Sequence, residues 1–241
     1  MKKKSNKTKF NGIDVAIVHY NTPELTAAAI RSLEKCTPGC RITILDNSDK
    51  RPFTKRIPNV KVIKNTKGQL IDFEKWLETF PEKMKDNANN YGSAKHCYSI
   101  QWLIDNTDKP FILLDGDVLI KKDLTPLWKP EMAFVARVST NTKKYGMEIY
   151  RATPFVCFIN VPMIKEAGVK YFNPEYMWDL SYKSPNNRYD TGAWFLRDCK
   201  EHKLPYEKAD TVSMALHYRH ASWSDTDASE WLEENKELHT L

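Results

Sequence analysis

The sequence lacks a long apolar segment and a paired cysteine framework. The lysine-rich start is not followed by the apolar stretch of a secretory signal. The five cysteines are an odd number, and Cys36 and Cys40 have no matching Cys/His pair that could complete a zinc site. These absences argue against a membrane-spanning helix and a disulfide-stapled fold. We therefore expect a soluble chain in the reducing cytoplasm.

Glycine-rich phosphate-binding sequences are also missing. Neither GxGxxG nor GxxxxGK[ST] occurs, so the sequence supports neither a Rossmann dinucleotide site nor a P-loop. The 241 residues include 41% hydrophobic and 28% charged residues, which is the composition of a globular chain. No internal repeat or low-complexity tract interrupts them. We expect one α/β domain over residues 11–241, preceded by a basic, flexible N-terminus at residues 1–10.

The formal net charge is +6, and part of this excess lies in a cluster of lysines at the start of the chain, namely Lys2, Lys3, Lys4, Lys7 and Lys9. A solvated, disordered tail is the simpler interpretation. The alternative is weak peripheral contact with an anionic membrane, which would place a cytoplasmic protein at the inner face of that membrane. Because the excess is small and no basic-aromatic pattern accompanies it, we expect no nucleic-acid partner.

An apolar run that ends on two carboxylates is the feature around which the chain is organised. Phe111 to Leu114 are apolar and too few for a separate helix, and Asp115-Gly116-Asp117 follows them. Such a run is typical of a strand buried on both faces of a sheet, with the acids at its carboxyl end, where open α/β sheets bind ligands. Neighbouring carboxylates repel each other, so a divalent cation that carries a phosphorylated substrate would relieve them. Gly116 is expected to allow a tight turn and to leave room for the ligand.

The first part of the chain has the pattern of a β-α-β unit with short links, which favours a parallel sheet with a right-handed crossover. Polar residues follow successive strands at Tyr20-Asn21 and Asp46-Asn47, and should converge on the edge that carries the two acids. The pattern predicts strands at 13–20, 41–45, 60–64, 111–114, 132–138, 155–161 and 211–217. It predicts loops at 139–152 and 171–189, and helices at 25–36, 94–105, 190–202 and 225–239.

Five segments occur in an order that is informative when they are taken together. They are VHYN (18–21), LDNSD (45–49), NNYGSA (89–94), LLDGD (113–117) and HYRHASW (217–223). In this order they resemble motifs of the GT-A glycosyltransferases, and within that fold the inverting family 2, over residues 14–223. A lone D-x-D is common by chance, whereas five segments in the expected order are not.

The resemblance implies a single GT-A domain with a mostly parallel central sheet flanked by helices. It implies transfer of a sugar from a nucleotide-diphosphate donor to a hydroxyl of an acceptor, either a glycan or a lipid-linked glycan. The implied ligands of Mn²⁺ or Mg²⁺ are Asp117, Asp115 and His217, with His220 as the alternative histidine. The implied donor-binding residues are Tyr20, Asn21, Asp46, Asn90 and Asp115. The implied catalytic base is Asp190, at the start of a late helix, where Tyr189 stands in place of the family's Glu.

Several of these residues also have a simpler structural interpretation. Asp190 is a good helix N-cap, and Asp46 suits the turn in Asp-Asn-Ser. His217 ends an apolar stretch and could be a core histidine that a neighbour satisfies. His19 lies within a strand, so we expect it to be packed and not catalytic. The acids at 115 and 117 could merely close a loop.

Three other functions compete with sugar transfer. A haloacid-dehalogenase-like phosphatase would need a Thr where Leu119 stands, and its motif would follow the first strand. A nucleotidyltransferase of related fold would need a glycine-rich basic loop after the first strand, where His19-Tyr20-Asn21-Thr22 stands instead. A non-catalytic module that binds nucleotide-sugars or glycans would not need the acidic pair.

Overall fold

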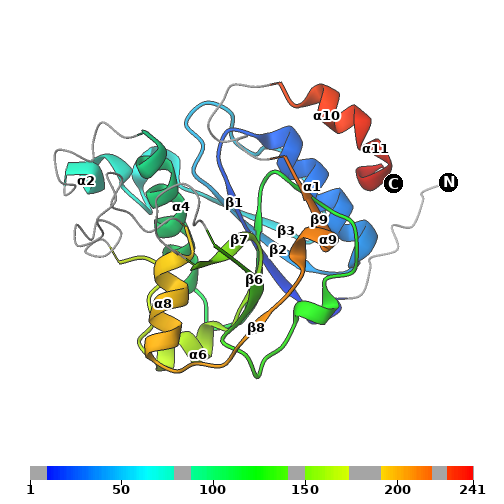
Figure 1. The fold of residues 1–241 in the computed structure, drawn as a ribbon. Helices are drawn as coiled ribbons and strands as arrows, with labels where there is room; N and C mark the ends of the chain where they lie inside the picture. Colours follow the sequence, from blue (N-terminus) through cyan, green and yellow to red (C-terminus); the bar gives the residue numbers. More distant parts are fainter. Residues whose placement is uncertain (1–9, 79–87, 141–149, 174–190, 219–226, 241) are drawn as a thin grey trace.

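The structure is a computed structural model that describes residues 10–78, 88–140, 150–173, 191–218 and 227–240 (Figure 1). Its centre is a seven-stranded sheet in the order β3-β2-β1-β4-β7-β6-β8. The strands of this sheet are β1 (Asp14–His19), β2 (Arg41–Asp46), β3 (Val60–Lys64), β4 (Phe111–Asp115), β6 (Phe134–Thr140), β7 (Tyr150–Ile159) and β8 (Tyr206–Lys208). A second, two-stranded sheet pairs β5 (Val118–Ile120) with β9 (Ala215–His217).

The direction of the strands sets the position of the polar strand ends. β1 pairs in parallel with β2 and with β4, while β7 runs antiparallel to β4 and to β6. The register places His19 opposite Asp46 and Val18 opposite Asp115. Three neighbouring strands therefore end together, and the predicted convergence of their polar ends at one edge is confirmed. The expected α/β class is also confirmed.

Helices cover both faces of the central sheet (Figure 1). One face carries α1 (Pro23–Cys36), with α10 (Ser229–Glu234) and α11 (Lys236–His239) beside it. The other face carries α4 (Ala88–Asp105), α6 (Val161–Glu166) and α8 (Ala193–Glu201). The remaining helical segments are α2 (Phe73–Glu78), α9 (Thr211–Met214) and the 3-10 turns η1 (Thr66–Gly68) and η2 (Thr125–Leu127). None of the helices in the described part of the chain is both long and apolar enough to cross a membrane.

Burial on both faces explains why the sequence of strand β4 is apolar without alternation. Ile112 and Leu114 pack into the core under α1, and Phe111 and Leu113 pack into the core under α4 and α8. All four side chains are buried, and each such burial contributes about 1.5–3 kcal/mol to folding. The strand is therefore fixed from both faces, and the carboxylate of Asp115 at its end is held on a rigid element.

Two cationic side chains of α1 donate hydrogen bonds to backbone carbonyl groups of the C-terminal helix α11. Arg31 donates from Nε to the carbonyl oxygen of His239 at 3.0 Å, and Lys35 donates from Nζ to that of Glu237 at 2.5 Å. The last carbonyls of a helix have no partner within it, so cations at this position stabilise the helix end. The short helix α11 therefore depends on α1 for its placement.

Some sequence expectations differ from the structure. Residues 211–217 are not one strand, because Asp210 accepts a hydrogen bond from Ser213 N at 3.3 Å and caps the short helix α9 before β9 begins. The strands β6 and β7 extend into the expected loop at 139–152, reaching Thr140 and starting at Tyr150. The strand β8 was not expected, since YEK has little apolar pattern, and it forms through pairing with β6.

Candidate functional site

Two carboxylates stand at the carboxyl end of β4, where the chain turns into β5. Asp115 is the last residue of β4, and Asp117 precedes Val118, the first residue of β5. Their side chains are only 15% and 13% exposed. Two acids in a nearly buried turn are costly unless a cation or a donor compensates them.

The strand β9 brings a histidine to this turn. Val118 is paired with His217, and the backbone N–H of Tyr218 donates to the carbonyl oxygen of Asp117 at 3.0 Å. The Nε2 atom of His217 lies 3.1 Å from Asp117 Oδ1 and 3.7 Å from Asp115 Oδ2. Its ring stacks on Phe155 of β7, with centroids 5.3 Å apart and planes at 18°. The stacking and the strand pairing together fix the direction in which the imidazole points.

A second histidine approaches from the opposite side. His96 of α4 places Nε2 3.3 Å from Asp115 Oδ1. Burial raises the pKa of the Asp115 carboxyl above its usual value, while His96 and His217 oppose that shift and the charge of Asp117 adds to it. Within the described part of the chain, Asp115 Oδ1 is buried and accepts no hydrogen bond. Two histidines and the charge of Arg151 thus act against the cost of burying this carboxylate.

The donor set at this turn fits a divalent cation. Asp115, Asp117 and His217 each offer one ligand atom, and these atoms lie within 4.8 Å of one another. Two carboxylate oxygens and one imidazole nitrogen are ligands that divalent cations accept. Asp115 Oδ1 is buried and has no hydrogen bond among the described residues beyond the ion-pair contact with His96, so this carboxylate keeps acceptor capacity that a cation can use.

Gly116 is needed here for space and not for an unusual backbone conformation. Its φ is not among the positive values that glycines adopt elsewhere in the described chain, so the expected tight turn does not depend on such a conformation. A Cβ at this position would lie 2.7 Å from Thr26 Oγ1. That hydroxyl donates to the carbonyl oxygen of Gly116 at 3.1 Å. The turn is therefore packed directly on α1.

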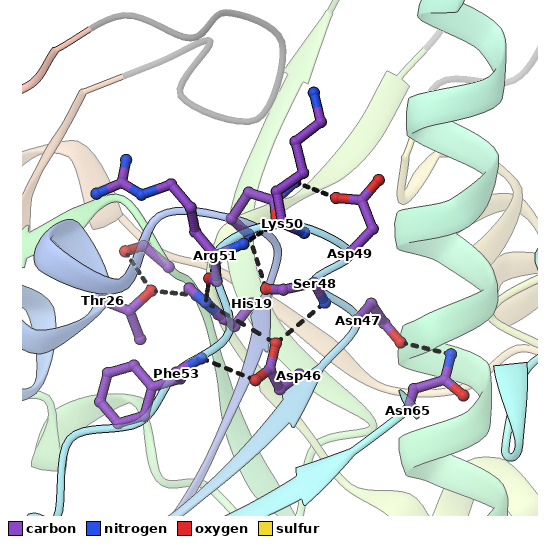
Figure 2. A network of polar contacts seen from close by, with 12 residues as sticks. His19, Thr26, Asp46, Asn47, Ser48, Asp49, Lys50, Arg51, Phe53 and Asn65 are labelled. Carbon is purple, nitrogen blue, oxygen red and sulfur yellow. Dashed lines mark hydrogen bonds and ion pairs between the residues drawn. The ribbon is translucent and has the colours of Figure 1, made fainter. Parts of the chain in front are cut away.

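The ends of β1 and β2 form a second polar cluster (Figure 2), and β1 is the neighbour of β4 in the sheet. Asn21, which has a left-handed φ of 55°, donates from Nδ2 to Asp49 and accepts at Oδ1 from the backbone N–H groups of Lys50 and Arg51. Tyr20 donates from its hydroxyl to Asp49 Oδ2 at 3.1 Å. These donors lower the pKa of the Asp49 carboxyl. Tyr20 and Asn21 thus hold the loop after β2 in place.

Asp46 holds the same loop from inside. It is 3% exposed, and its two oxygens accept from Ser48 N at 3.0 Å and from Phe53 N at 2.8 Å (Figure 2). Both carboxylate oxygens are thus used by the backbone. These contacts favour the turn interpretation of Asp46, while its contact with a nucleotide base stays a prediction.

A lysine of α4 faces this cluster. The Nζ atom of Lys95 lies 5.6 Å from the ring centroid of Tyr20 and 5.2 Å from that of Phe73. Burial lowers the pKa of Lys95, and the charges of Asp49 and Glu74 oppose the shift. A cation between two aromatic rings at the end of β1 gives the cluster both a flat apolar surface and a positive charge.

Three residues predicted for the site cannot be placed as side chains. Asn90 lies in the first turn of α4, and only its backbone is described. Asp190 and His220 lie outside the described residues. The structure therefore brings Asp115, Asp117 and His217 together, and Tyr20, Asn21 and Asp46 beside them, while the predicted base is not placed.

Sequence reasoning missed His96 and Lys95. Both lie on α4 directly after the segment NNYGSA, which was singled out for its resemblance to a motif. The only available signal was that α4 leads into β4, and this does not tell which helix face meets the acids. His19 was expected to be packed, and this is confirmed, since its side chain is fully buried.

Comparisons with known proteins identify the fold. No protein-family model and no curated protein sequence matches this chain. The galactosyltransferase LgtC, solved in complex with donor and acceptor sugar analogs, is similar with a TM-score of 0.60 and 15% identity, over 94% of this chain and 95% of LgtC. The glycosyltransferase GlyE of Streptococcus pneumoniae TIGR4 gives a TM-score of 0.52 and 14% identity, over 97% of this chain but only 61% of GlyE. At such identities the likeness shows the fold alone, and this chain has the GT-A fold.

Proposed function

We propose that this protein is a metal-dependent glycosyltransferase that moves a sugar from a nucleoside-diphosphate donor to an acceptor hydroxyl. The observation that carries the proposal is the cluster of Asp115, Asp117 and His217 at the edge where β1, β2 and β4 end. Open α/β sheets bind nucleotides at this edge, and a diphosphate leaving group needs a positive charge there. The GT-A fold supports the same proposal by analogy.

Each part of the site has a defined task in this reaction. A divalent cation held by Asp115, Asp117 and His217 would neutralise the charge that develops on the leaving diphosphate. The Nε2 atom of His96 lies 3.3 Å from Asp115 Oδ1, where an ion pair can orient that carboxylate. Tyr20 and Lys95 form the wall beside the acids, and a nucleotide base can stack against the tyrosine ring. The chain's own residues thus orient the donor between a cationic wall and the acids.

The ligand set favours Mn²⁺ over Mg²⁺. Magnesium prefers oxygen ligands alone and an octahedral shell with several waters, whereas an imidazole suits transition metals. The Nε2 atom of His217 faces both carboxylates. We therefore expect tighter binding of Mn²⁺ than of Mg²⁺, which equilibrium titration of the two ions into the protein would measure.

The stereochemical course stays a prediction. Inversion with Asp190 as the base follows from the resemblance to family 2, and the fold alone does not decide between inversion and retention. An inverting enzyme needs a base for the acceptor hydroxyl. NMR of the first-formed product would read the anomeric configuration. Asp190→Asn should then abolish transfer and spare donor binding, and retained transfer would reassign the base.

The acceptor is proposed to be a hydroxyl of a glycan or of a lipid-linked glycan. The lysines at positions 2–9 could assist a lipid-linked acceptor by weak contact with an anionic membrane at its cytoplasmic face. Deletion of residues 2–9 tests this with anionic liposomes in a sedimentation assay. Reduced sedimentation supports the contact, and unchanged sedimentation identifies the segment as a solvated tail.

The proposal is tested by a panel of nucleotide-sugars, with and without Mn²⁺. Donor hydrolysis and thermal stabilisation are measured for wild type and for Asp117→Ala. We expect one donor to be hydrolysed only with Mn²⁺, and the variant to lose this dependence. Stabilisation without hydrolysis or transfer would indicate a binding module, and no metal-dependent response to any nucleotide-sugar would refute the proposal.

A further inference from the structure

A buried hydrogen-bonded chain connects the turn of the acids to β1. The hydroxyl of Thr26 in α1 lies 3.1 Å from the carbonyl oxygen of Gly116 and 2.8 Å from Nδ1 of His19. Thr26 and His19 are both 0% exposed. No water can replace these contacts without a rearrangement of the core, so they specify how the turn sits on α1.

The carbonyl oxygen of Gly116, at one end of this row of hydrogen bonds, sets the direction of the others. A carbonyl oxygen can only accept, so the Thr26 hydroxyl donates its single proton to Gly116. Thr26 Oγ1 must then accept from His19, which places a proton on Nδ1 of the imidazole. A valine at position 26 would have nearly the same shape, yet it would leave the Gly116 carbonyl and the His19 N–H without partners.

The other side of His19 faces the loop from Asp46 to Phe53. Its Nε2 atom lies 3.4 Å from the carbonyl oxygen of Arg51 and 3.9 Å from Asp46 Oδ1 (Figure 2). The ring meets Phe53 edge to face, with centroids 5.7 Å apart. With its proton on Nδ1, a neutral imidazole has no proton on Nε2 to donate, so His19 contacts this loop by packing, while through Thr26 it is hydrogen-bonded to the turn that carries Asp115 and Asp117.

We propose that His19 and Thr26 are positioning residues that couple the loop of residues 46–53 to the turn of Asp115-Gly116-Asp117. Thr26 is hydrogen-bonded to the backbone of Gly116 and His19 to Thr26, so both act on the turn through that backbone. The coupling makes the metal affinity of the turn depend on the conformation of the loop. This inference rests on the metal role of the acids in the proposed function. It adds His19 and Thr26 as residues through which the loop affects that metal site.

The test is the affinity for Mn²⁺ alone, measured by electron paramagnetic resonance of the free ion, with folding checked by circular dichroism. Removing a group that orients a metal ligand typically weakens binding about 10- to 100-fold. We expect such a loss in Thr26→Val and near wild-type affinity in Thr26→Ser, which keeps the hydroxyl. Thr211→Val is the matched control, because Thr211 is also fully buried and its hydroxyl has no hydrogen-bond partner among the described residues.

A second arm tests the coupling from the loop side. Asp46→Asn changes the loop and leaves the acids untouched, so it should weaken Mn²⁺ binding, and this effect should shrink in the Thr26→Val background. A folded Thr26→Val with wild-type affinity would overturn the inference. If that variant does not fold, an unchanged affinity in Asp46→Asn overturns it instead. Wild-type protein that binds no Mn²⁺ would refute the metal site of the proposed function, and the coupling with it.

Discussion

Replacement of Gly116 by alanine is expected to destabilise the protein through one identifiable contact. The new Cβ would lie 2.7 Å from Thr26 Oγ1, closer than a methyl carbon and a hydroxyl oxygen can approach. Thr26 is fully buried on α1 and cannot move away without giving up its bonds to Gly116 and His19. The next contacts are looser, at 3.4 Å and 3.9 Å, so the clash has a single source.

The size of the effect follows from the cost of overpacking a buried site. One extra carbon in a packed core costs about 1–3 kcal/mol. For a chain of this size that corresponds to a melting temperature lower by roughly 2–12 °C. Urea denaturation followed by circular dichroism gives the free energy of unfolding for wild type and Gly116→Ala.

A second substitution makes the reasoning specific. Thr26→Ala alone leaves buried polar groups unpaired and should cost about 1–3 kcal/mol. In the double variant the new methyl group at position 116 occupies space that Thr26 has vacated. The loss in free energy of unfolding in the double variant should therefore be smaller than the sum of the two single losses, by about 1 kcal/mol or more.

The control is Gly168→Ala. Gly168 has a φ of +74° and nothing within 4 Å of an added Cβ, so its cost comes from the backbone and should add to that of Thr26→Ala without coupling. A Gly116→Ala protein as stable as wild type would refute the packing argument. Strict additivity of Gly116→Ala with Thr26→Ala would refute the assignment of the clash to Thr26.

Three further predictions concern His19, Asp46 and Arg31. Burial lowers the pKa of His19 below its usual 6.5 and outweighs the attraction of Asp46, so below that pH the unfolded chain binds more protons. Stability should fall as the pH drops below 6.5, and His19→Asn should remove this component from urea titrations; an unchanged pH dependence would contradict it. Asp46→Asn should lower the free energy of unfolding by about 1–3 kcal/mol, because two backbone N–H groups lose their anionic acceptor. If Asp46→Asn instead keeps the stability of the wild type and changes only the binding of the nucleotide-sugar, the result supports a contact between Asp46 and the nucleotide base. Arg31→Ala should speed amide hydrogen exchange in α11, since the carbonyl of His239 loses its donor; unchanged exchange would show that packing alone holds this helix.

The sequence was sufficient to predict the parts of the fold that depend on local pattern. The apolar run before Asp115 marks a strand buried on both faces, and the polar residues after β1 and β2 mark the edge of the sheet. The resemblance implied Asp117 and His217 as ligands of one metal, with His220 as the alternative, and strand pairing between β5 and β9 brings the first two side chains within 3.1 Å of each other.

Features that depend on packing between distant elements were not predictable. His96 meets Asp115 because α4 crosses the end of the sheet with one particular face, and helical periodicity alone does not fix that face. The strand β8 pairs with β6, and Tyr206 stacks on its partner Phe134, with centroids 4.9 Å apart and planes at 6°; both contacts join residues that are distant in sequence. The chain from His19 through Thr26 to Gly116 joins residues that only the fold brings together.

The metal affinity of the turn tests the central claim most directly. Titration of Mn²⁺ into wild type, Asp117→Asn and His217→Ala should show one bound ion in wild type and a large loss of affinity in both variants. Asp108→Asn is the matched control, because Asp108 is an exposed carboxylate near β4 whose partner is Lys165. If Asp117→Asn binds Mn²⁺ as tightly as the wild type and the Asp108 control, the acids at the end of β4 do not form the metal site.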